Sequence, residues 1–368
     1  MKIFVIGTRG IPHIPGGVET HCQELYPRIV SAGHSVTVTT RTPYVHEKKK
    51  CWKGVLLKHI YTPRKKSLEA VIHTFLAAFA AKASKPDLVH VHAVGPSLLI
   101  PFMRLLGMKV VMTHHGPDYN RDKWGTMAKK ALMLGEYWGC KYANEVIVIS
   151  SVIGDIVKRR CNRESNLIYN GVTLPEKTTK TDDLERHRII PGEYVLSVAR
   201  LVPEKGLHDL IDAFIKIPGK HQLVIAGDAD HETKYSRELK KKAASDSRII
   251  FTGYITGEYL NQIFSHAKQF VLPSYHEGLP IALLEAMSYN IPPLVSDIPA
   301  HQEVALPEYC YFKCGNVASL RSQLEHALNS DINKPEPVDY RSIVAEKYDW
   351  DKITRETIAV YEKALTKV

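Results

Sequence analysis

The stretch GTRGIPHIPGGVET, residues Gly7–Thr20, follows a short apolar run, KIFVI, that has the pattern of a buried first strand. A glycine-rich loop between a first strand and a first helix is typical of phosphate binding, because the free N–H groups at the helix start attract an anion. The common dinucleotide signature requires G-x-G-x-x-G and an acidic residue at the end of the second strand. Here the loop has the sequence G-T-R-G-I-P, and the expected second strand ends with Thr39–Thr40–Arg41. Both requirements fail for NAD, while Arg41 leaves an NADP-dependent oxidoreductase as an alternative.

Short β-branched runs alternate with helical patterns along both halves of the chain, which is typical of parallel α/β sheets. In the first half we expect strands at Lys2–Ile6, Ser35–Thr39, Leu88–His92, Lys109–Thr113 and Glu145–Ile149. In the second half we expect strands at Tyr194–Ala199, Gln222–Ala226, Ile249–Thr252, Gln269–Leu272 and Pro292–Ser296. The sequence therefore predicts an α/β protein with two Rossmann-like, doubly wound parallel sheets.

A polar linker, Pro175–Glu185, separates the two halves. We place an N-terminal Rossmann-like domain at residues 1–175 and a C-terminal one at residues 176–349. An amphipathic helix at about 350–368 is expected to pack back on the first domain. Ligands bind at the carboxyl ends of strands in such sheets, and two facing sheets create a cleft between them. We therefore expect the site to lie between the two domains.

The composition is that of a globular protein, with 368 residues of which 44% are hydrophobic and 24% charged. The longest apolar-rich stretches are broken by polar residues before they reach the roughly 18–20 residues that span a bilayer. Met1–Lys2 leads straight into the first expected strand, with no secretory signal pattern. Six cysteines scattered along the chain favour reduced thiols. Together these features predict a cytoplasmic protein.

The charge is distributed unevenly between the two halves. Residues 1–175 carry 25 lysines and arginines against 11 acidic residues, whereas the remainder carries 24 against 28. This basic first half points to an anionic partner. A nucleic acid is disfavoured, because no aromatic–basic interleaving or known nucleic-acid motif is present. Cations between the second and third expected strands instead suggest peripheral contact with an anionic membrane surface: Lys48, Lys49, Lys50, Lys53, Lys58, Arg64, Lys65 and Lys66.

The segment SYHEGLPIALLEAM, Ser274–Met287, places two glutamates eight residues apart around the start of an expected helix, Leu279–Ser288. Glu277 precedes the helix, and Glu285 lies about two turns inside it. Free N–H groups at such a helix start bind anions or hydroxyls. Two carboxylates around them could hold two sets of hydroxyls on one extended ligand, although isolated glutamates are more often simply solvated.

Two further segments follow expected strands directly. In SVARLVPEKGL, Arg200 offers a bidentate fork and Lys205 a point charge, a combination suited to a diphosphate, although each could also be an ordinary surface cation. In MTHHGPDYNRDKWG, alternation along the strand turns one of His114 and His115 towards the core and leaves the other at the strand's mouth. We expect both segments to contribute to a site.

The sequence gives little support for a metal ion. Asp228–Ala229–Asp230 matches the DxD string of metal-dependent sugar-nucleotide enzymes, but a string of three residues often arises by chance. His90 and His92 alternate on one strand face without an evident third ligand, which favours core packing. We therefore expect no metal site.

Six short motifs occur in a fixed order along nearly the whole chain. They are GGVE at Gly16–Glu19, HG at His115–Gly116, IVIS at Ile147–Ser150, NGV at Asn170–Val172, the pair Arg200 and Lys205, and E-x7-E at Glu277 and Glu285. Together they resemble the family 4 glycosyltransferases, which have the GT-B fold of two facing Rossmann-like domains.

GTRGIP and HHGPDYNRDKWG also resemble the branch that builds bacterial surface polysaccharides, namely capsule, O-antigen or exopolysaccharide. That branch usually has HGLDW, whereas here Pro117 and Tyr119 replace the leucine and the tryptophan. The difference bears on the choice of sugar or acceptor and leaves the expected fold unchanged.

The resemblance implies a nucleotide-diphosphate sugar as the donor, a UDP-sugar or a GDP-sugar, and no cofactor. It implies that Arg200 and Lys205 neutralise the diphosphate, while N–H groups near Gly16 and Gly17 assist from the other domain. Glu285 would bind the ribose hydroxyls.

The resemblance also implies the contacts of the sugar. Glu277, with the N–H groups of Gly278 and Leu279, would hold the sugar, and His115 would contact it near the transferring carbon. The other expected contacts are with the nucleotide base, at Tyr254 and Ile255, and with the acceptor, at Arg9, His13 and Asp118.

Family members retain the anomeric configuration without a divalent metal. Attack on the leaving-group face lets the departing diphosphate take the acceptor's proton, so no separate base is needed, and the two cations stabilise the developing charge. The resemblance thus implies a hexosyl- or deoxyhexosyltransferase that acts on a glycan acceptor, with a lipid-linked one expected. A sugar-nucleotide epimerase of the same architecture remains an alternative.

Overall fold

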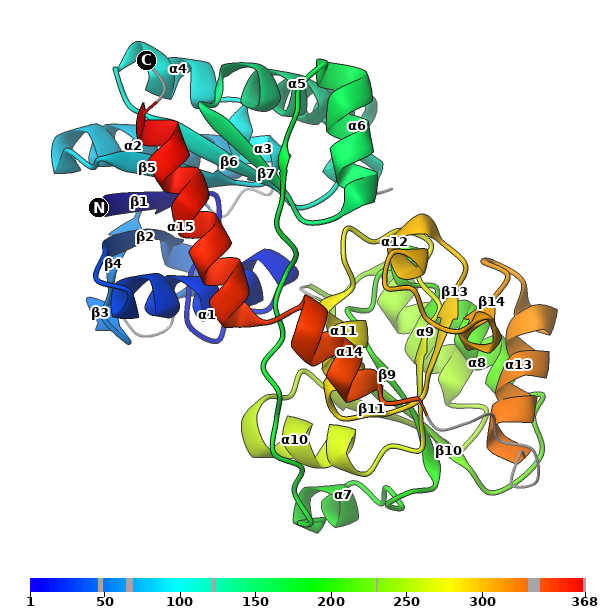
Figure 1. The fold of residues 1–368 in the computed structure, drawn as a ribbon. Coiled ribbons are helices and arrows are strands. Elements are labelled where there is room, and N and C mark those ends of the chain that lie inside the picture. Colours follow the sequence, from blue (N-terminus) through cyan, green and yellow to red (C-terminus); the bar gives the residue numbers. More distant parts are fainter. Residues whose placement is uncertain (46–48, 64–68, 121–123, 230, 330–337, 367–368) are drawn as a thin grey trace. The chain divides into compact units, whose positions relative to one another are not determined.

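The computed structural model describes residues 1–45, 49–63, 69–120, 124–229, 231–329 and 338–366. It divides into two compact units (Figure 1). Unit 1 contains Met1–Gly171 and Trp350–Val368, and unit 2 contains Val172–Asp349. Each unit is an α/β structure around its own sheet, as the sequence predicts.

The sheet of unit 1 has eight strands in the order β3-β4-β2-β1-β5-β6-β7-β8. All described pairings are parallel except that between β3 and β4. The strands are β1 (Lys2–Ile6), β2 (Ser35–Arg41), β3 (Cys51–Trp52), β4 (Val55–Ile60), β5 (Leu88–His92), β6 (Val110–His114), β7 (Glu145–Val148) and β8 (Asn166–Leu167).

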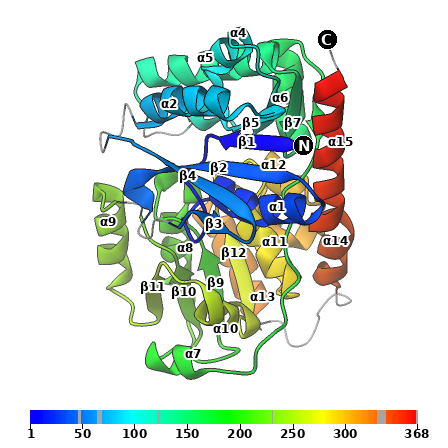
Figure 2. The same cartoon turned by 90° about the vertical axis from the view of Figure 1, so that its left-hand side faces the viewer.

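Helices cover both faces of this sheet (Figures 1 and 2). They are α1 (Gly17–Ser31), α2 (Glu69–Ser84), α3 (Val94–Ser97), α4 (Ile100–Leu105), α5 (Thr126–Tyr142), α6 (Ser151–Cys161) and α15 (Trp350–Thr366), with short 3-10 turns η1 (Thr42–Tyr44) and η2 (Asp118–Asn120). The buried residues Cys22, Leu25, Tyr26 and Ile29 recur along α1 at helical spacing and face the core. Helix α15 joins the same core through residues such as Ile353, Val360 and Tyr361, so it packs beside α1 although unit 2 separates the two in sequence.

The sheet of unit 2 has six parallel strands in the order β11-β10-β9-β12-β13-β14. They are β9 (Tyr194–Val198), β10 (Gln222–Ala226), β11 (Ile249–Gly253), β12 (Gln269–Leu272), β13 (Pro293–Ser296) and β14 (Tyr311–Phe312). The helices are α7 (Asp182–Arg186), α8 (Leu207–Phe214), α9 (Lys234–Ala243), α10 (Gly257–Ser265), α11 (Ile281–Ser288), α12 (Pro299–Gln302), α13 (Val317–Asn329) and α14 (Tyr340–Lys347), with 3-10 turns η3 (Pro203–Lys205) and η4 (Glu308–Cys310).

The structure corrects several sequence expectations in detail. Helix α11 begins at Ile281 rather than Leu279, because Pro280 has extended backbone angles and acts as its N-cap. Glu285 therefore lies about one turn inside the helix instead of two. The hairpin β3–β4 was not predicted, although buried Val55 and Leu57 alternate with exposed neighbours along β4, as in a half-buried strand.

Among the residues that the structure describes, every helix is too short or too polar to cross a bilayer.

Candidate active site

The glycine loop of unit 1 is closed by the Glu19 carboxylate. Glu19 Oε1 accepts the backbone N–H of Arg9 at 2.9 Å and the Arg9 Nε–H at 3.3 Å. The Arg9 guanidinium also donates to the carbonyl of Pro15. These bonds fix the loop from both sides while leaving the side chain of Glu19 only 7% exposed. Glu19 belongs to the motif GGVE, but its role in closing the loop was not predicted.

Gly16 is required by this arrangement. Its φ of 142° is rarely adopted by other residues, and a Cβ there would lie 2.1 Å from Glu19 Oε2. Gly16 is the N-cap of α1, and Gly17 is the exposed first residue of that helix. The structure thus presents the start of α1 beside a rigid loop, and the expected contact of these glycines with a diphosphate stays a prediction.

The three residues expected on the acceptor side lie on two loops of unit 1. Arg9 belongs to the closed glycine loop, and His13 is exposed with its N–H donating to Gln23 Oε1 at 2.7 Å. Asp118 begins η2 and is half-buried after β6. Their contact with an acceptor stays a prediction.

The two histidines at the end of β6 point in different directions, which confirms the prediction from strand alternation. His114 is buried, and its Nε2 lies 2.9 Å from Glu136 Oε1. Tyr119 and Arg160 contact the same carboxylate, at 2.9 and 2.6 Å. His115 is half-buried at the mouth of the strand. His114 therefore anchors the strand end, and the expected contact of His115 with a sugar stays a prediction.

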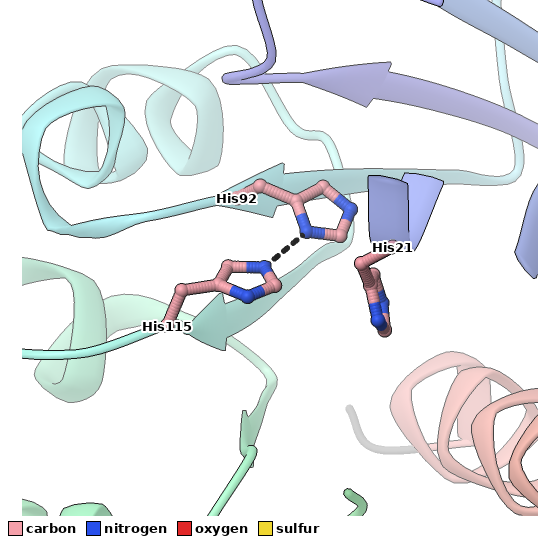
Figure 3. A group of neighbouring side chains, drawn as sticks. All are labelled: His21, His92 and His115. Atoms are coloured by element: carbon pink, nitrogen blue, oxygen red, sulfur yellow. Dashed lines mark hydrogen bonds between the residues drawn. The ribbon is translucent and has the colours of Figure 1, made fainter. Parts of the chain in front are cut away.

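His115 belongs to a cluster of imidazoles that the sequence did not reveal (Figure 3). Its Nε2 lies 2.8 Å from Nδ1 of His92, on the neighbouring strand β5. His21 of α1 stands edge-on to both rings, at centroid distances of 5.2 Å from His115 and 5.7 Å from His92. Burial lowers the pKa of His92 and of His115 well below the ordinary value, and that of His21 to about 4. All three rings are neutral near pH 7.

Neutral imidazoles are the form that binds metals, and one ring nitrogen from each of the three histidines lies within 4.8 Å of the others. His92, however, already uses both of its ring nitrogens, Nδ1 with His115 and Nε2 with Tyr26. A metal ion would have to break one of these bonds. The cluster as it stands therefore fits a hydrogen-bonded group better than a metal centre.

Lowering the pH from 6.5 to 5 is expected to destabilise unit 1. The unfolded chain takes up protons on histidine as the pH falls through 6.5, whereas folded His21 and His90, with pKa values of about 4 and 3, do not. Each such group lowers the free energy of unfolding by about 1.4 kcal/mol per pH unit. Urea denaturation at several pH values measures this, and His21→Gln should flatten the dependence by one group. A constant free energy of unfolding over this range would contradict the buried neutral state.

In unit 2, three neighbouring strands lead into one group of polar side chains. β9 lies beside β12, and β12 beside β13, so their carboxyl ends meet at one edge of the sheet. The loop after β9 contains Lys205, the loop after β12 contains Glu277, and α12, after β13, contains His301. The two loops are tied together by the Tyr275 N–H, which donates to the Glu204 carbonyl at 2.9 Å.

Lys205 and Glu277 form an ion pair, with Lys205 Nζ donating to Oε1 of Glu277. The Ser274 hydroxyl donates to the same oxygen at 2.7 Å. Burial alone would raise the pKa of Glu277, but the Lys205 ammonium, His301 and Ser274 together hold it below its ordinary value. The sequence singled out both residues but assigned them to different parts of a ligand, and it did not predict their contact.

His301 was missed by the sequence analysis. It is fully buried, and its Nδ1 lies 2.8 Å from the Ser296 carbonyl, to which it donates. Burial lowers its pKa to about 4, although Glu277 acts in the opposite direction. Among the residues that the structure describes, Nε2 of His301 has no hydrogen-bond partner. A neutral imidazole lone pair therefore stands beside the Lys205–Glu277 pair.

The other residues expected to bind the donor lie around this edge of unit 2. Arg200 is half-buried just after β9, and Glu285 is half-buried in α11. Leu279 is buried between Gly278 and the N-cap Pro280, so the chain enters α11 in a fixed path. The residues expected at the base follow β11, with Tyr254 exposed and Ile255 half-buried. In the DxD string Asp228 pairs with Lys240 at 3.1 Å, and Asp230 lies outside the described residues.

The chain matches two family models. Residues 15–175 match the model described as Glycosyltransferase Family 4, and residues 181–343 match the one described as Glycosyl transferases group 1.

Curated relatives include an uncharacterized glycosyltransferase of Methanocaldococcus jannaschii, 28% identical over 99% of both chains. The serotype-specific mannosyltransferase WbdA of Escherichia coli is 28% identical over 56% of this chain and 26% of that protein.

Similar solved structures include sucrose-phosphate synthase from Thermosynechococcus elongatus, with a TM-score of 0.83, 21% identity and 98% coverage of both chains. HepE of Anabaena in complex with UDP-glucose has a TM-score of 0.79 at 16% identity, with the same coverage. The chain is a glycosyltransferase that belongs to family 4 and has the GT-B fold.

Proposed function

We propose that this glycosyltransferase moves a sugar from a nucleotide-diphosphate sugar to a lipid-linked glycan acceptor in the synthesis of a surface polysaccharide. The observation that carries the proposal is the partly buried Lys205–Glu277 pair at the edge where three strands meet, with Arg200 half-buried just after one of these strands, β9. The cations Arg200 and Lys205 can pair with the charges of a diphosphate, and the fixed carboxylate of Glu277 can accept hydrogen bonds from sugar hydroxyls. The UDP-glucose complex of the similar HepE supports a nucleotide-sugar donor. A related O-antigen chain mannosyltransferase of Escherichia coli, 23% identical over 49% of this chain, supports a surface-polysaccharide product.

We propose further that transfer proceeds with retention and without a divalent metal. The acceptor oxygen attacks on the face from which the diphosphate departs, the bond from the sugar carbon to the diphosphate oxygen breaks, and the departing diphosphate takes the acceptor's proton. Arg200 and Lys205 stabilise the charge that develops on the diphosphate. Burial lowers the pKa of His301, beside the Lys205–Glu277 pair, to about 4, so its imidazole is neutral near pH 7.

A donor screen tests the proposal. Thermal shift with UDP, GDP, dTDP and CMP identifies the base, and the matching sugar nucleotides are then incubated with and without a glycan acceptor, each with and without EDTA. Sugar transfer with retained anomeric configuration in EDTA is expected. Conversion of a sugar nucleotide without any acceptor would instead support the epimerase, and inversion or loss of activity in EDTA would overturn the mechanism.

Replacing Glu285 with alanine is expected to weaken nucleotide binding by about tenfold or more, because a hydrogen bond to a charged group contributes about 1.5–3 kcal/mol. Calorimetric titration with the nucleotide diphosphate measures the change. Glu308→Ala, which removes an exposed carboxylate of the same unit, is the matched control and should bind normally. Equal affinity of the two variants would contradict the ribose contact.

We also propose that unit 1 contacts an anionic membrane surface, which fits a lipid-linked acceptor. Of the cations expected for this contact, Lys49 and Lys50 are exposed just before the β3–β4 hairpin, and Lys53 and Lys58 are exposed on it. Lys48 and Arg64–Lys66 lie outside the described residues.

A second feature of unit 1 supports the same partner, and we call it the apolar face. It consists of side chains on α2 and α4: Val71, Phe75, Leu76, Phe79, Phe102 and Leu105. Five of these six are exposed, Leu105 by 84%. The three phenylalanines contact one another, with centroid distances of 5.0–5.7 Å. An exposed apolar patch of this kind marks an interaction surface. Cations at its end, Lys82 and Arg104, suit anionic headgroups.

Phe75→Ser/Phe79→Ser is expected to reduce flotation with vesicles that contain anionic lipid, because it removes two rings that would enter the headgroup region. Ile190→Ser, which changes a half-exposed apolar residue of unit 2, is the control. Binding of the wild type should weaken with salt, since each cation near the surface contributes about 1 kcal/mol. Failure of the wild type to float at low salt would end the membrane proposal.

A further inference from the structure

A chain of hydrogen-bonded side chains runs from His115 into the core of unit 1. His115 Nε2 contacts His92 Nδ1 at 2.8 Å, and His92 Nε2 contacts the Tyr26 hydroxyl at 2.5 Å. Tyr26 also lies 2.9 Å from Nδ1 of His90. All members behind His115 are buried, so water does not compete for these bonds. Figure 3 shows the outer end of the chain, where the rings of His92 and His115 face each other through their nitrogens.

The inner end of the chain determines where its protons lie. His90 Nε2 is 2.7 Å from the Thr113 hydroxyl, and His90 Nδ1 is 2.7 Å from the Tyr361 hydroxyl of α15. A phenol is a good donor and an imidazole lone pair a good acceptor. Tyr361, the nearer of the two phenols, therefore donates to Nδ1 of His90, and His90 donates its Nε2–H to Thr113.

The remaining directions follow in sequence. Tyr26 has one proton and three neighbouring acceptors: Nδ1 of His90, which already accepts from Tyr361, the hydroxyl oxygen of Tyr361, and Nε2 of His92. An imidazole lone pair is a stronger acceptor than a phenol oxygen, so the proton goes to Nε2 of His92 at the shorter distance of 2.5 Å. Neutral His92 then carries its own proton on Nδ1 and donates it to Nε2 of His115. A neutral His115 must hold its proton on the other nitrogen, Nδ1.

We propose that Tyr361, His90, Tyr26 and His92 act as positioning residues that fix His115 in its Nδ1–H form, so that it offers an N–H donor to a ligand oxygen. The inference rests on the proposed transfer from a nucleotide-diphosphate sugar, in which the family resemblance implies that His115 contacts the sugar. No other described side chain or backbone group forms a hydrogen bond with Nδ1 of His115, which leaves this nitrogen for the ligand. Burial keeps the pKa of each imidazole in the chain below its ordinary value, so none of them adds a second proton near pH 7. The chain thus selects one of the two neutral forms of His115. The Nδ1–H form offers a hydrogen-bond donor to the ligand, whereas the Nε2–H form would offer an acceptor.

Long-range nitrogen–proton NMR spectra of the protein labelled with 15N-histidine distinguish the two neutral forms directly. His115→Gln assigns the signals of His115 by their loss. We expect the Nδ1–H form for His115 and for His92 in the wild type. The Nε2–H form at His115 would overturn the proposal. Zinc should leave these signals unchanged, and a stoichiometric shift of His21, His92 and His115 together would show a metal site in place of the chain.

Three variants of His92 separate positioning from packing. An asparagine amide can take the place of Nδ1 and a glutamine amide that of Nε2, so His92→Asn keeps the bond to His115 and His92→Gln keeps only the bond to Tyr26. His92→Phe loses both. We expect kcat/KM for sugar transfer to fall about tenfold in the glutamine and phenylalanine variants and to recover in the asparagine variant. Equal losses in all three would show a packing role only.

Tyr26→Phe and Tyr361→Phe complete the test, because each removes one hydroxyl and leaves the ring in place. A mixture of the two forms at His115 is expected in both, and an unchanged spectrum would contradict the route through the core. The NMR result does not depend on activity. If the Nδ1–H form is observed but His115→Gln transfers sugar at the wild-type rate, the proposed contact with the sugar fails and the chain stands.

Discussion

Lys205→Ala is expected to lower kcat for sugar transfer by about a hundred- to a thousandfold, the loss typical when one preorganised group that stabilises a transition state is removed. Lys205 is the cation of the partly buried pair with Glu277, and its proposed role is to stabilise the charge that develops on the diphosphate. Steady-state kinetics with the donor identified in the screen measure the loss. Activity close to that of the wild type would contradict the assignment to the diphosphate.

The same variant also has a cost in stability that must be separated from the loss of activity. It leaves the carboxylate of Glu277, 11% exposed, without its cation, and removing one partner of a buried pair destabilises by about 3–5 kcal/mol. Lys205→Ala/Glu277→Gln removes both charges and should recover most of the free energy of unfolding while remaining inactive. Lys242→Ala, which breaks the more exposed pair with Asp212, is the control and should be neutral in both measurements.

Gly206→Ala is expected to reduce the free energy of unfolding by about 3–5 kcal/mol, which combines the strain of a left-handed residue with a steric clash. Gly206 has a φ of 63°, and a Cβ there would lie 2.0 Å from the backbone oxygen of Pro273. The two loops that carry Lys205 and Glu277 would have to separate, so activity should fall beyond the loss of folded protein. Urea denaturation and kinetics on the folded fraction measure the two effects.

Gly257→Ala is a closely matched control for this prediction. Gly257 has nearly the same φ, 64°, but no atom lies within 4 Å of the position of its Cβ. Gly257→Ala should therefore reduce the free energy of unfolding only by the strain of the left-handed conformation, about 1–2 kcal/mol. Equal losses in the two variants would show that the close approach of Gly206 to Pro273 contributes nothing.

The positions of the strands could be predicted only in part from the sequence. Short runs such as Leu88–His92 and Gln269–Leu272 can be predicted as strands, because buried parallel strands are continuous apolar or β-branched segments. The hairpin at β3 and β4 lacks such a run, since Leu56 and Lys58 face solvent. The side chains expected after separate strands of unit 2, such as Lys205 and Glu277, lie at the same edge of its sheet, because the carboxyl ends of parallel strands point to one edge.

Contacts between distant segments could not be predicted. Lys205 and Glu277 are 72 residues apart, and only the pairing of β9 with β12 brings their loops together. His90 and His92 appeared to have no third ligand because His21 lies on a helix and His115 lies just past the end of another strand. Burial, which makes these imidazoles neutral, is likewise a property of the packed unit and not of any short motif.

The position of α15 in the sequence sets the order in which the two units can be completed during synthesis. Unit 2 is a continuous stretch, whereas the core of unit 1 needs Trp350 against Gly171 and Tyr361 against His90, both of which emerge from the ribosome only after unit 2. Until α15 is synthesised, the core of unit 1 lacks the side chains that this helix contributes, such as Ile353, Val360 and Tyr361. Completion of unit 1 therefore depends on synthesis of unit 2. A chain that ends anywhere within unit 2 lacks α15, so unit 1 is incomplete as well.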